Sequence, residues 1–480
     1  MTSAKTSKLR PTHLILLLTL LTRFLILVLI YLSSYLPSFD SSPNILLPPP
    51  PLDASWAEKA LWRVTNPLLR WDSFHFAHIA KEGHVFEHEW AFLPGIANIM
   101  RLSAQFIRLL FPHSNPELSV RELMVGGALA SFLVDVLTPL TLYKLTLRHF
   151  PGRPSIALIS ALLGLLPSSP ATLRYAPYTE PFFTFFSYQG MLACANGRYL
   201  LASTLFACAG AFRSNGVLLG GFVIWDLVAY PFLQRKSFSI WRAVYATILT
   251  ALIFTPFIAH QHSAYTLFCS SPPPSSNPNP IWCNKTLPSI YTYVQSKYWN
   301  VGFLTYWTPS QIPNFIISIP PLLLLFAFSS YHLVQVIPRL LFPTPTSQLR
   351  KQKRHLESNE VPPSPFLSET LTPHAIHALV LSLTLLFASH TQIVLRLAAS
   401  MPILYWAGAW LLVEEPEFSM SGLWRGRGRA GEKGKLSLRG SREEQVGKGK
   451  GVRWGSWWVG WSVVWGSVSV VLWTTFLPPA

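Results

Sequence analysis

The chain has 480 residues; half of them are hydrophobic, only 12% are charged, and the formal net charge is +17. A soluble globular protein carries about 25% charged residues, so this composition excludes an ordinary soluble enzyme. The basic residues gather between apolar runs without any nucleic-acid-binding motif, so we expect no nucleic-acid partner. The apolar runs, many of them near 20 residues long, predict an all-α polytopic membrane protein.

The first apolar run covers residues 13–36 and follows a basic segment at 5–10. It is too long for the apolar core of a signal peptide and lacks a clear cleavage site, which indicates an uncleaved anchor. Basic residues favour the cytosolic side of membrane helices, so we expect a cytosolic N-terminus. The segment 37–120 then forms the first lumenal loop.

Further apolar runs alternate across the membrane from there to the end of the chain. They lie at 121–147, 155–169, 181–195, 199–212, 217–232, 244–260, 315–336, 376–389, 393–413 and 457–477. The alternation predicts a second large lumenal loop at 261–312, a basic cytosolic loop at 341–372 and a disordered basic cytosolic insert at 414–455. We therefore expect a single polytopic membrane domain over 1–480 with about ten transmembrane helices, several of them shorter than a full crossing.

The block 70–95 concentrates ionisable and aromatic side chains in the first lumenal loop. Such a concentration in a membrane protein favours a catalytic or ligand site. Asp72 follows Trp71, and a carboxylate beside aromatic rings can act as a general base. The alternative is a loop aspartate that caps the helix expected after it.

The same block offers further candidates. His75 and His78 lie three residues apart on one helical face, where they could bind phosphate when protonated or simply line the interface. Glu87 beside His88 is a second acid–base candidate, although adjacent residues of a helix do not face each other. His75, His78 and Glu87 could together bind a metal ion, but their spacing matches no recognised ligand set, so we expect no metal.

Two polar turns fall on the same predicted side of the membrane. Arg174 and Glu180 are expected to pair across their turn and orient the flanking spans. Arg213-Ser214-Asn215-Gly216 precedes a span, and an arginine beside a helix N-terminus makes a good phosphate site; a simple turn is the alternative.

A third polar patch lies near residues 390–396. His390, Gln392 and Arg396 stand close to a helix start, and Arg396 shares a face with Gln392 four residues earlier. A buried arginine in a membrane protein needs an anion, either a carboxylate of the chain or a ligand phosphate. Aromatic and amide groups in 291–313 complete a surface suited to an amphiphilic, anionic sugar ligand.

The loop 261–312 carries two signs of an oxidising compartment. Cys269 and Cys283 flank a stretch rich in Pro, Ser and Asn, so a disulfide between them is plausible if the loop is lumenal. Asn284-Lys285-Thr286 is the only glycosylation sequon in the chain, and it falls in the same loop.

With these residues in place, the chain resembles the PIG-V family of mannosyltransferases. The matching motifs are Trp71-Asp72-Ser73-x-His75-Phe76-x-x-Ile79-Ala80-x-x-Gly83, Glu87-His88-x-x-Ala91-Phe92-x-Pro94-Gly95, Arg213-Ser214-Asn215-Gly216, Tyr293-Val294-Gln295-x-x-Tyr298-Trp299-Asn300-Val301-Gly302-Phe303, Gln311-Ile312-Pro313-Asn314-Phe315, His390-x-Gln392-x-x-x-Arg396 and Pro402-x-x-Tyr405-Trp406. Tyr178-Thr179-Glu180 departs mildly from an expected Tyr-Ser-Glu, and the segment 414–453 matches nothing in the family.

The resemblance implies a C-type glycosyltransferase fold in the endoplasmic reticulum membrane. It implies inverting transfer of mannose from dolichyl-phosphate-mannose, through an α-1,6 linkage, to a mono-mannosylated glycosylphosphatidylinositol (GPI) precursor. Asp72 matches the catalytic base, with Glu87 in reserve. Substrate contacts are expected from Trp71, His75, Arg213, Asn215, Gln295, Trp299, Asn300, His390, Gln392 and Arg396. No cofactor is expected beyond the donor substrate, and a small accessory membrane subunit is a possible partner.

Other activities remain open on these residues. A different dolichyl-phosphate-mannose-dependent mannosyltransferase would share every motif, because motifs do not reveal the acceptor. A transporter of lipid-linked sugars would share the phosphate-binding arginines but need no base, and the inverted repeats typical of such proteins are not evident. A non-catalytic subunit would not need concentrated polar groups.

Overall fold

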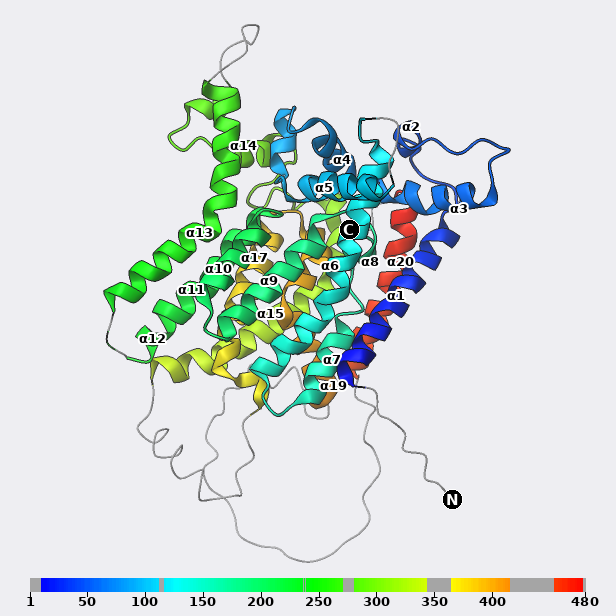
Figure 1. The fold of residues 1–480 in the computed structure, drawn as a ribbon. Helices are drawn as coiled ribbons and strands as arrows, with labels where there is room; N and C mark the ends of the chain where they lie inside the picture. The colour runs from blue at the N-terminus through cyan, green and yellow to red at the C-terminus, as the bar shows by residue number, and fades with distance from the viewer. Residues whose placement is uncertain are drawn as a thin grey trace, which may run out of the picture.

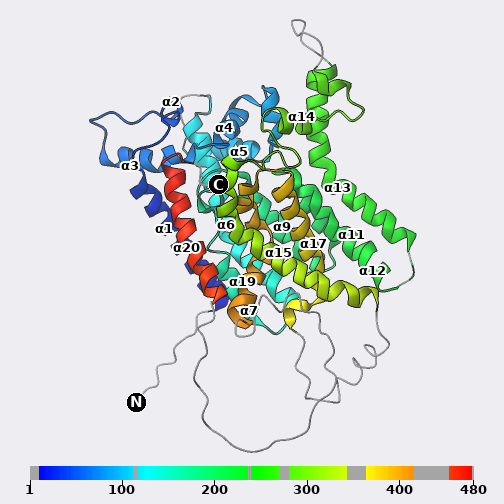
Figure 2. The same cartoon turned by 180° about the vertical axis from the view of Figure 1, so that it is seen from behind.

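The computed structural model describes residues 10–111, 116–235, 237, 239–270, 280–342, 364–414 and 453–477. These residues form helices joined by loops, without a strand among them, which confirms the all-α prediction. Most of the basic loop 341–372 and of the insert 414–455, together with the basic segment that precedes the first span, lie outside the described residues. The helices run mostly side by side as one bundle (Figure 1, Figure 2).

Each predicted apolar run corresponds to a helix, but fewer than ten meet the length and hydropathy of a full crossing. Six do so: α1 (Pro11–Ser33), α6 (Val120–His149), the stretch Ser214–Leu233 that contains α11 (Gly220–Ile224) and α12 (Tyr230–Leu233), α13 (Ile240–Tyr265) with its extension to Ser270, α15 (Ile312–Leu341) and α17 (Thr372–Phe387). A seventh is present if a bent pair near the C-terminal end counts as one span.

The remaining predicted spans are shorter or less apolar. Helix α7 (Pro154–Leu163) has 10 residues, α10 (Tyr199–Gly210) has 12 and α9 (Thr179–Ala195) has 17. Helix α20 (Trp454–Thr474) is long enough at 21 residues, but tryptophan and glycine lower its hydropathy. Short helices inside a membrane bundle are tolerated where protein covers their ends.

The run 393–413 is not one straight helix. Its first part, Thr391–Ser400, and the helix α19 (Pro402–Glu414) meet at an angle of 82°. The break falls at Met401, just before Pro402, and a residue that precedes proline is disfavoured in the α-helical conformation. The bend turns α18 (Val394–Leu397), which carries Arg396, across the end of the bundle.

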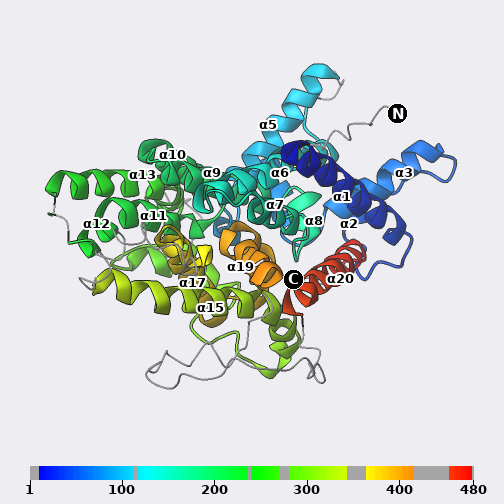
Figure 3. The same ribbon diagram turned by 90° about the horizontal axis from the view of Figure 1, so that it is seen from below.

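One end of the bundle carries the polar segments. Helices α3 (Trp56–Thr65), α4 (Ser73–Glu82), α5 (Gly95–Leu110) and α14 (Ile290–Lys297) gather at this end (Figure 1). Helix α5 lies across the bundle rather than along it, and Figure 3 shows it projecting from the side. Its outer face exposes Leu102, Phe106 and Leu109, which suits the membrane interface.

Close backbone contacts fix this end to the bundle. A side chain at Gly126 of α6 would come within 2.7 Å of the Ala104 backbone nitrogen in α5, so the absence of a Cβ lets the two helices touch. Helix α20 packs along α1 and reaches the same end, where the Phe39 N–H donates to the Thr475 carbonyl at 2.8 Å. The polar end therefore includes the segment that follows α1 and the C-terminal end of α20 (Figure 1).

Candidate active site

A tight turn presents Asp72 at the start of α4. Trp71 adopts a left-handed backbone conformation, φ 51°, which costs a non-glycine residue about 1–3 kcal/mol. The Ser73 hydroxyl donates to the Arg70 carbonyl and accepts from the Arg70 N–H, both at 2.6 Å. Tyr178 donates to the same carbonyl at 2.9 Å. The turn is thus held from both sides.

Arg70 anchors this turn to the C-terminal helix. Its side chain is buried, and it donates to the Asn66 and Thr474 carbonyls at 2.9 and 3.2 Å. The second of these contacts reaches the last turn of α20, whose carbonyls carry the negative end of the helix dipole. Trp71 packs on Phe476 just beyond that helix, with ring centroids 5.2 Å apart.

Asp72 occupies the N-cap position of α4 without capping it, because its side chain accepts no hydrogen bond from the helix backbone. Its carboxylate instead pairs with Arg396 at 2.9 Å. The capping alternative therefore does not describe this residue. About 29% of the Asp72 side chain stays exposed, which leaves the carboxylate accessible to a substrate.

Arg396 links Asp72 to a second ion pair. Its Nε lies 3.7 Å from the Glu180 carboxylate, which is 1% exposed and accepts from Arg213 at 2.7 Å. Asp72, Arg396, Glu180 and Arg213 form what we call the charge network. Two carboxylates balance two guanidinium groups there. When an incoming anion displaces a carboxylate from an arginine, the displaced carboxylate still lies close to another charge of the network.

The expected pair of Arg174 with Glu180 is wrong. Arg174 contacts Asp135 of α6, which also contacts Arg23 of α1, and all three side chains are nearly fully buried. In the sequence these three charged residues lie inside apolar runs or at their edges, and their spacing does not predict that they contact one another. Charged groups buried in a membrane bundle need partners; Asp135 pairs with both arginines, and Arg174 also donates to the Gly164 carbonyl. These contacts join α1 and α6 to the turn before α9.

Thr179 makes a contact that the serine expected from the family pattern would also make. Its hydroxyl accepts a hydrogen bond from Arg213 at 3.0 Å. A serine hydroxyl supplies the same acceptor, so threonine serves equally well at this position. Neighbouring Tyr178 is buried, and its ring lies 6.0 Å from the Arg396 guanidinium.

Aromatic rings form a wall beside Asp72. His75 stacks on Phe92 at 5.2 Å and meets Trp299 edge-on at 5.8 Å. The His390 Nε2 lies 2.8 Å from the Trp299 carbonyl, and its ring stacks on Tyr306 at 4.7 Å. Such faces suit the C–H surface of a sugar. The structure therefore brings His75, Trp299 and His390 together.

Burial decides the charge of these histidines. Desolvation lowers the pKa of His75 and of His390, with nearby Asp72 opposing the effect in both. Both rings are therefore neutral near pH 7. Since a carbonyl only accepts, His390 donates through Nε2 and keeps Nδ1 as an acceptor, which suits a sugar hydroxyl better than a phosphate.

The remaining predicted residues fall into two groups. Gln392 accepts from the Tyr306 hydroxyl, which also accepts from Asn314 at 2.9 Å, so Gln392 belongs to the wall. The Asn215 side-chain nitrogen and the Trp299 indole nitrogen are buried without a hydrogen-bond partner among the described residues. Buried donors are usually satisfied, so these two nitrogens are exceptions within the site.

Gln295 and Asn300 shape a loop. The Gln295 carbonyl accepts from the Val301 N–H at 2.8 Å, and the Asn300 carbonyl accepts from Thr305 at 2.9 Å. Asn300 has φ 50°, a conformation that asparagine tolerates better than most residues. These contacts are those of a turn that presents Trp299, rather than contacts with the charge network.

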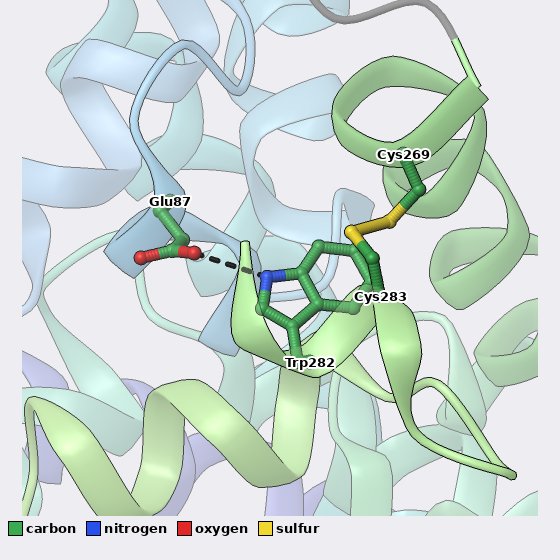
Figure 4. The surroundings of a disulfide bond; sticks show 4 residues. All are labelled: Glu87, Cys269, Trp282 and Cys283. Atoms are coloured by element: carbon green, nitrogen blue, oxygen red, sulfur yellow. Dashed lines mark hydrogen bonds between the residues drawn. A yellow bond between two sulfur atoms is a disulfide. The ribbon is translucent and has the colours of Figure 1, made fainter. Parts of the chain in front are cut away.

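Glu87 is engaged away from the charge network. Its carboxylate accepts from the Trp282 indole at 3.0 Å (Figure 4). It also accepts from the Tyr298 hydroxyl at 2.7 Å. Trp282 lies in the segment that precedes α14, and Tyr298 directly follows the last residue of α14. The contacts tie the block 70–95 to the loop 261–312, so Glu87 is occupied in holding two segments together.

A disulfide joins Cys269 to Cys283 beside that contact (Figure 4). It closes a loop with a sequence separation of 14 residues, and Trp282 next to it is fully buried. Asn284 is exposed one residue further on, as an acceptor of a glycan must be. Cys194 and Cys208 are free.

Thiol counting tests this pairing. Maleimide applied to the denatured, unreduced protein should label two cysteines, Cys194 and Cys208, and four after reduction, since only the Cys269–Cys283 pair is oxidised. A Cys269→Ser/Cys283→Ser variant should show two under both conditions. Four labelled thiols without reductant would contradict the pairing.

An apolar groove lies within the helical bundle. It has a volume of about 350 Å³ and lies between α11, α13 and α17. Its lining residues are Val217, Leu218, Gly220, Gly221, Ile224, Trp225, Ala229, Thr250, Phe254, Pro373, Ile376, His377 and Val380. Val217 belongs to the same segment as Arg213, four residues earlier, so the groove starts close to the network.

Comparisons with known proteins place this chain in a family. A family model described as Mannosyltransferase (PIG-V) matches residues 12–480. A GPI mannosyltransferase 2 from Cryptococcus neoformans var. neoformans serotype D (strain B-3501A) is 33% identical over 99% of this chain and 100% of its own length. A GPI alpha-1,6-mannosyltransferase 2 from Cricetulus griseus is 32% identical over 77% of this chain and 80% of its own.

The corresponding protein from Homo sapiens, also named GPI alpha-1,6-mannosyltransferase 2, is 30% identical over 78% of this chain and 79% of its own. No solved structure matches the chain. The family model covers nearly the whole chain and the relatives cover most of it. The chain therefore belongs to the PIG-V mannosyltransferase family.

Proposed function

We propose that this chain transfers the second mannose of the GPI anchor, in α-1,6 linkage, from dolichyl-phosphate-mannose to a precursor that already carries one mannose. The observation that carries the proposal is the charge network at the polar end of a membrane bundle, in a chain of the PIG-V family. A carboxylate beside two arginines supplies both a base and a phosphate site.

The reaction we propose is a single displacement with inversion. The 6-hydroxyl oxygen of the acceptor mannose attacks the anomeric carbon of the β-linked donor, and the bond from that carbon to the phosphate oxygen breaks. Asp72 takes the hydroxyl proton, and the electron pair leaves with dolichyl phosphate. Arg396 and Arg213 stabilise the charge that develops on the phosphate. Phosphate is a fair leaving group, so this step requires no cofactor.

The apolar groove supports a donor with a long isoprenoid chain. A phosphate at Arg213 stands at the start of the segment whose later residues line the groove. A chain anchored there passes directly onto Val217 and Leu218 and then along α11. Burying the apolar surface of the donor lipid in a groove of this size is favourable, so we place the donor lipid in the groove.

Filling the groove should weaken donor binding. A Cβ added at Gly221 meets no atom within 4 Å, and the residue lines the groove, so Gly221→Phe projects into it without disturbing the protein. We expect the donor KM to rise at least about fivefold, because steric overlap costs about 1–3 kcal/mol. The rise should shrink with a short-chain donor.

Gly460→Phe is the matched control. Gly460 is an exposed helical glycine of α20 whose added Cβ also meets nothing within 4 Å, and it lies outside the groove. Both variants are assayed in the same membranes with long- and short-chain donors. Equal KM values for the two variants would exclude the groove as the donor site.

We further propose that the protein acts in the endoplasmic reticulum membrane, with its polar end lumenal, its N-terminus cytosolic and a small accessory membrane subunit as partner. The disulfide and the exposed sequon on one loop support that orientation. Expression in a strain that lacks the second GPI mannosyltransferase tests the function. Growth with loss of the accumulated mono-mannosyl precursor is expected; a product with another linkage would identify a different mannosyltransferase, and no product would reject the proposal.

A further inference from the structure

A second cluster of ionisable side chains lies next to the charge network. His75 of α4 and His88 and Glu89 of η2 (Glu87–Ala91) each offer one ligand atom, and these atoms all lie within 4.8 Å of one another. The cluster joins two segments that are separated by the turn at Gly83. None of its members belongs to the charge network, although the His75 ring also forms part of the aromatic wall.

The two histidines are available as ligands. Among the described residues, no hydrogen-bond partner occupies the ring nitrogens of His75 or His88. Aromatic contacts hold the rings instead: His75 stacks on Phe92 at 5.2 Å, and His88 stacks on Phe86 at 5.8 Å. The rings meet each other edge-on at 5.3 Å. Packing thus orients two imidazoles toward one place without using their nitrogen atoms.

Glu89 supplies a fixed negative charge at that place. It is 1% exposed, and its Oε2 accepts from the Val85 and Phe86 N–H groups, both at 2.9 Å. Its Oε1 lies 2.5 Å from His78 Nδ1. A carboxylate with this burial needs a positive partner. Among the described residues, His78 is the side chain in contact with this carboxylate, and a bound cation would supply the positive charge.

We propose that His75, His88 and Glu89 bind a divalent zinc ion. Two imidazole nitrogens and one carboxylate oxygen are donors that Zn²⁺ prefers, and three protein ligands leave a fourth position for water or a substrate oxygen. Bonds of about 2.1 Å at tetrahedral angles put ligand atoms about 3.4 Å apart. Small rotations of the two partly buried rings would bring ligand atoms that lie within 4.8 Å of one another to this spacing.

The ligand set differs from the one that sequence spacing suggested. His78 and Glu87 looked eligible beside His75, but His78 contacts Glu89 and Glu87 is held by Trp282 and Tyr298. His88 and Glu89 are adjacent in η2, yet one ligand atom of each lies within 4.8 Å of the other and of one from His75. The bound ion would lock that loop onto α4, one turn after Asp72.

Zinc binding by the full-length protein tests the proposal. The chain is purified through a histidine-free tag into lipid nanodiscs, stripped with chelator and titrated with Zn²⁺ alone. Metal content after gel filtration and the melting temperature with and without Zn²⁺ are measured for wild type, His88→Asn, His75→Asn and His262→Asn. His262 is an exposed histidine at the same end of the bundle and serves as the control.

Wild type and His262→Asn should retain about one zinc per chain and melt at a higher temperature when it is bound. His88→Asn and His75→Asn should bind at least about tenfold more weakly, since even second-shell changes cost that much. Their metal-free melting temperatures, compared with metal-free wild type, separate lost ligation from lost folding. Equal zinc content in all four proteins, or none above background in wild type, would overturn the proposal. Neither readout depends on mannosyl transfer.

Discussion

Replacing Asp72 with asparagine should reduce mannosyl transfer by at least about 100-fold, the lower range of general-base contributions. Asparagine keeps the size of the side chain but cannot accept the hydroxyl proton. The helix should tolerate the change, because Asp72 makes no capping hydrogen bond. Transfer from radiolabelled donor is measured in microsomes under saturating acceptor, with protein amounts matched by immunoblot.

Two controls separate a base from a surface charge. Asp53→Asn removes an exposed carboxylate of the same N-terminal loop and should leave turnover unchanged. Glu87→Gln should cost much less than Asp72→Asn, because Glu87 is held by Trp282 and Tyr298. Near-normal turnover in Asp72→Asn, or a larger loss in Glu87→Gln, would move the base away from Asp72.

Sequence reasoning located the site because its signals are local. Hydropathy over about 20 residues is a property of a continuous segment. Each apolar run could therefore be predicted as a helix, although the sequence did not show which helices cross the whole membrane. Alternation of those runs then placed the polar turns at one end. Asp72, Arg213 and Arg396 could be grouped in this way without any knowledge of which side chains touch.

Partner choice could not be predicted from the sequence. Glu180 lies six residues from Arg174 but pairs with Arg213, 33 residues away. Arg174 instead meets Asp135. Sequence distance favoured the wrong pair, because the turn before α9 points the two side chains to different neighbours. The bend at Met401 is different: Pro402 was a visible signal for it.

Arg396 should be the second position with a large effect. Its guanidinium contacts Asp72 at 2.9 Å and lies 3.7 Å from Glu180. Arg396→Ala removes a charge-stabilising donor and should lower turnover by about 100- to 1,000-fold. Arg396→Lys should recover part of this, since lysine keeps the charge but loses the planar, two-pronged geometry. The exposed Arg121 at the start of α6, changed to alanine, should have no effect.

Donor kinetics distinguish a phosphate contact from a structural ion pair. If Arg396 binds the phosphate, Arg396→Ala raises the donor KM or lowers kcat. The melting temperature of the double variant Asp72→Asn/Arg396→Ala should recover toward wild type, because neither member of the ion pair is left as an unpaired charge. Activity should not recover in that variant. If activity returned together with stability, the arginine would serve only to neutralise Asp72. Retained activity with unchanged donor affinity in Arg396→Ala alone would likewise exclude the phosphate role, and Arg213 would then be left as the only guanidinium of the charge network able to take the departing phosphate.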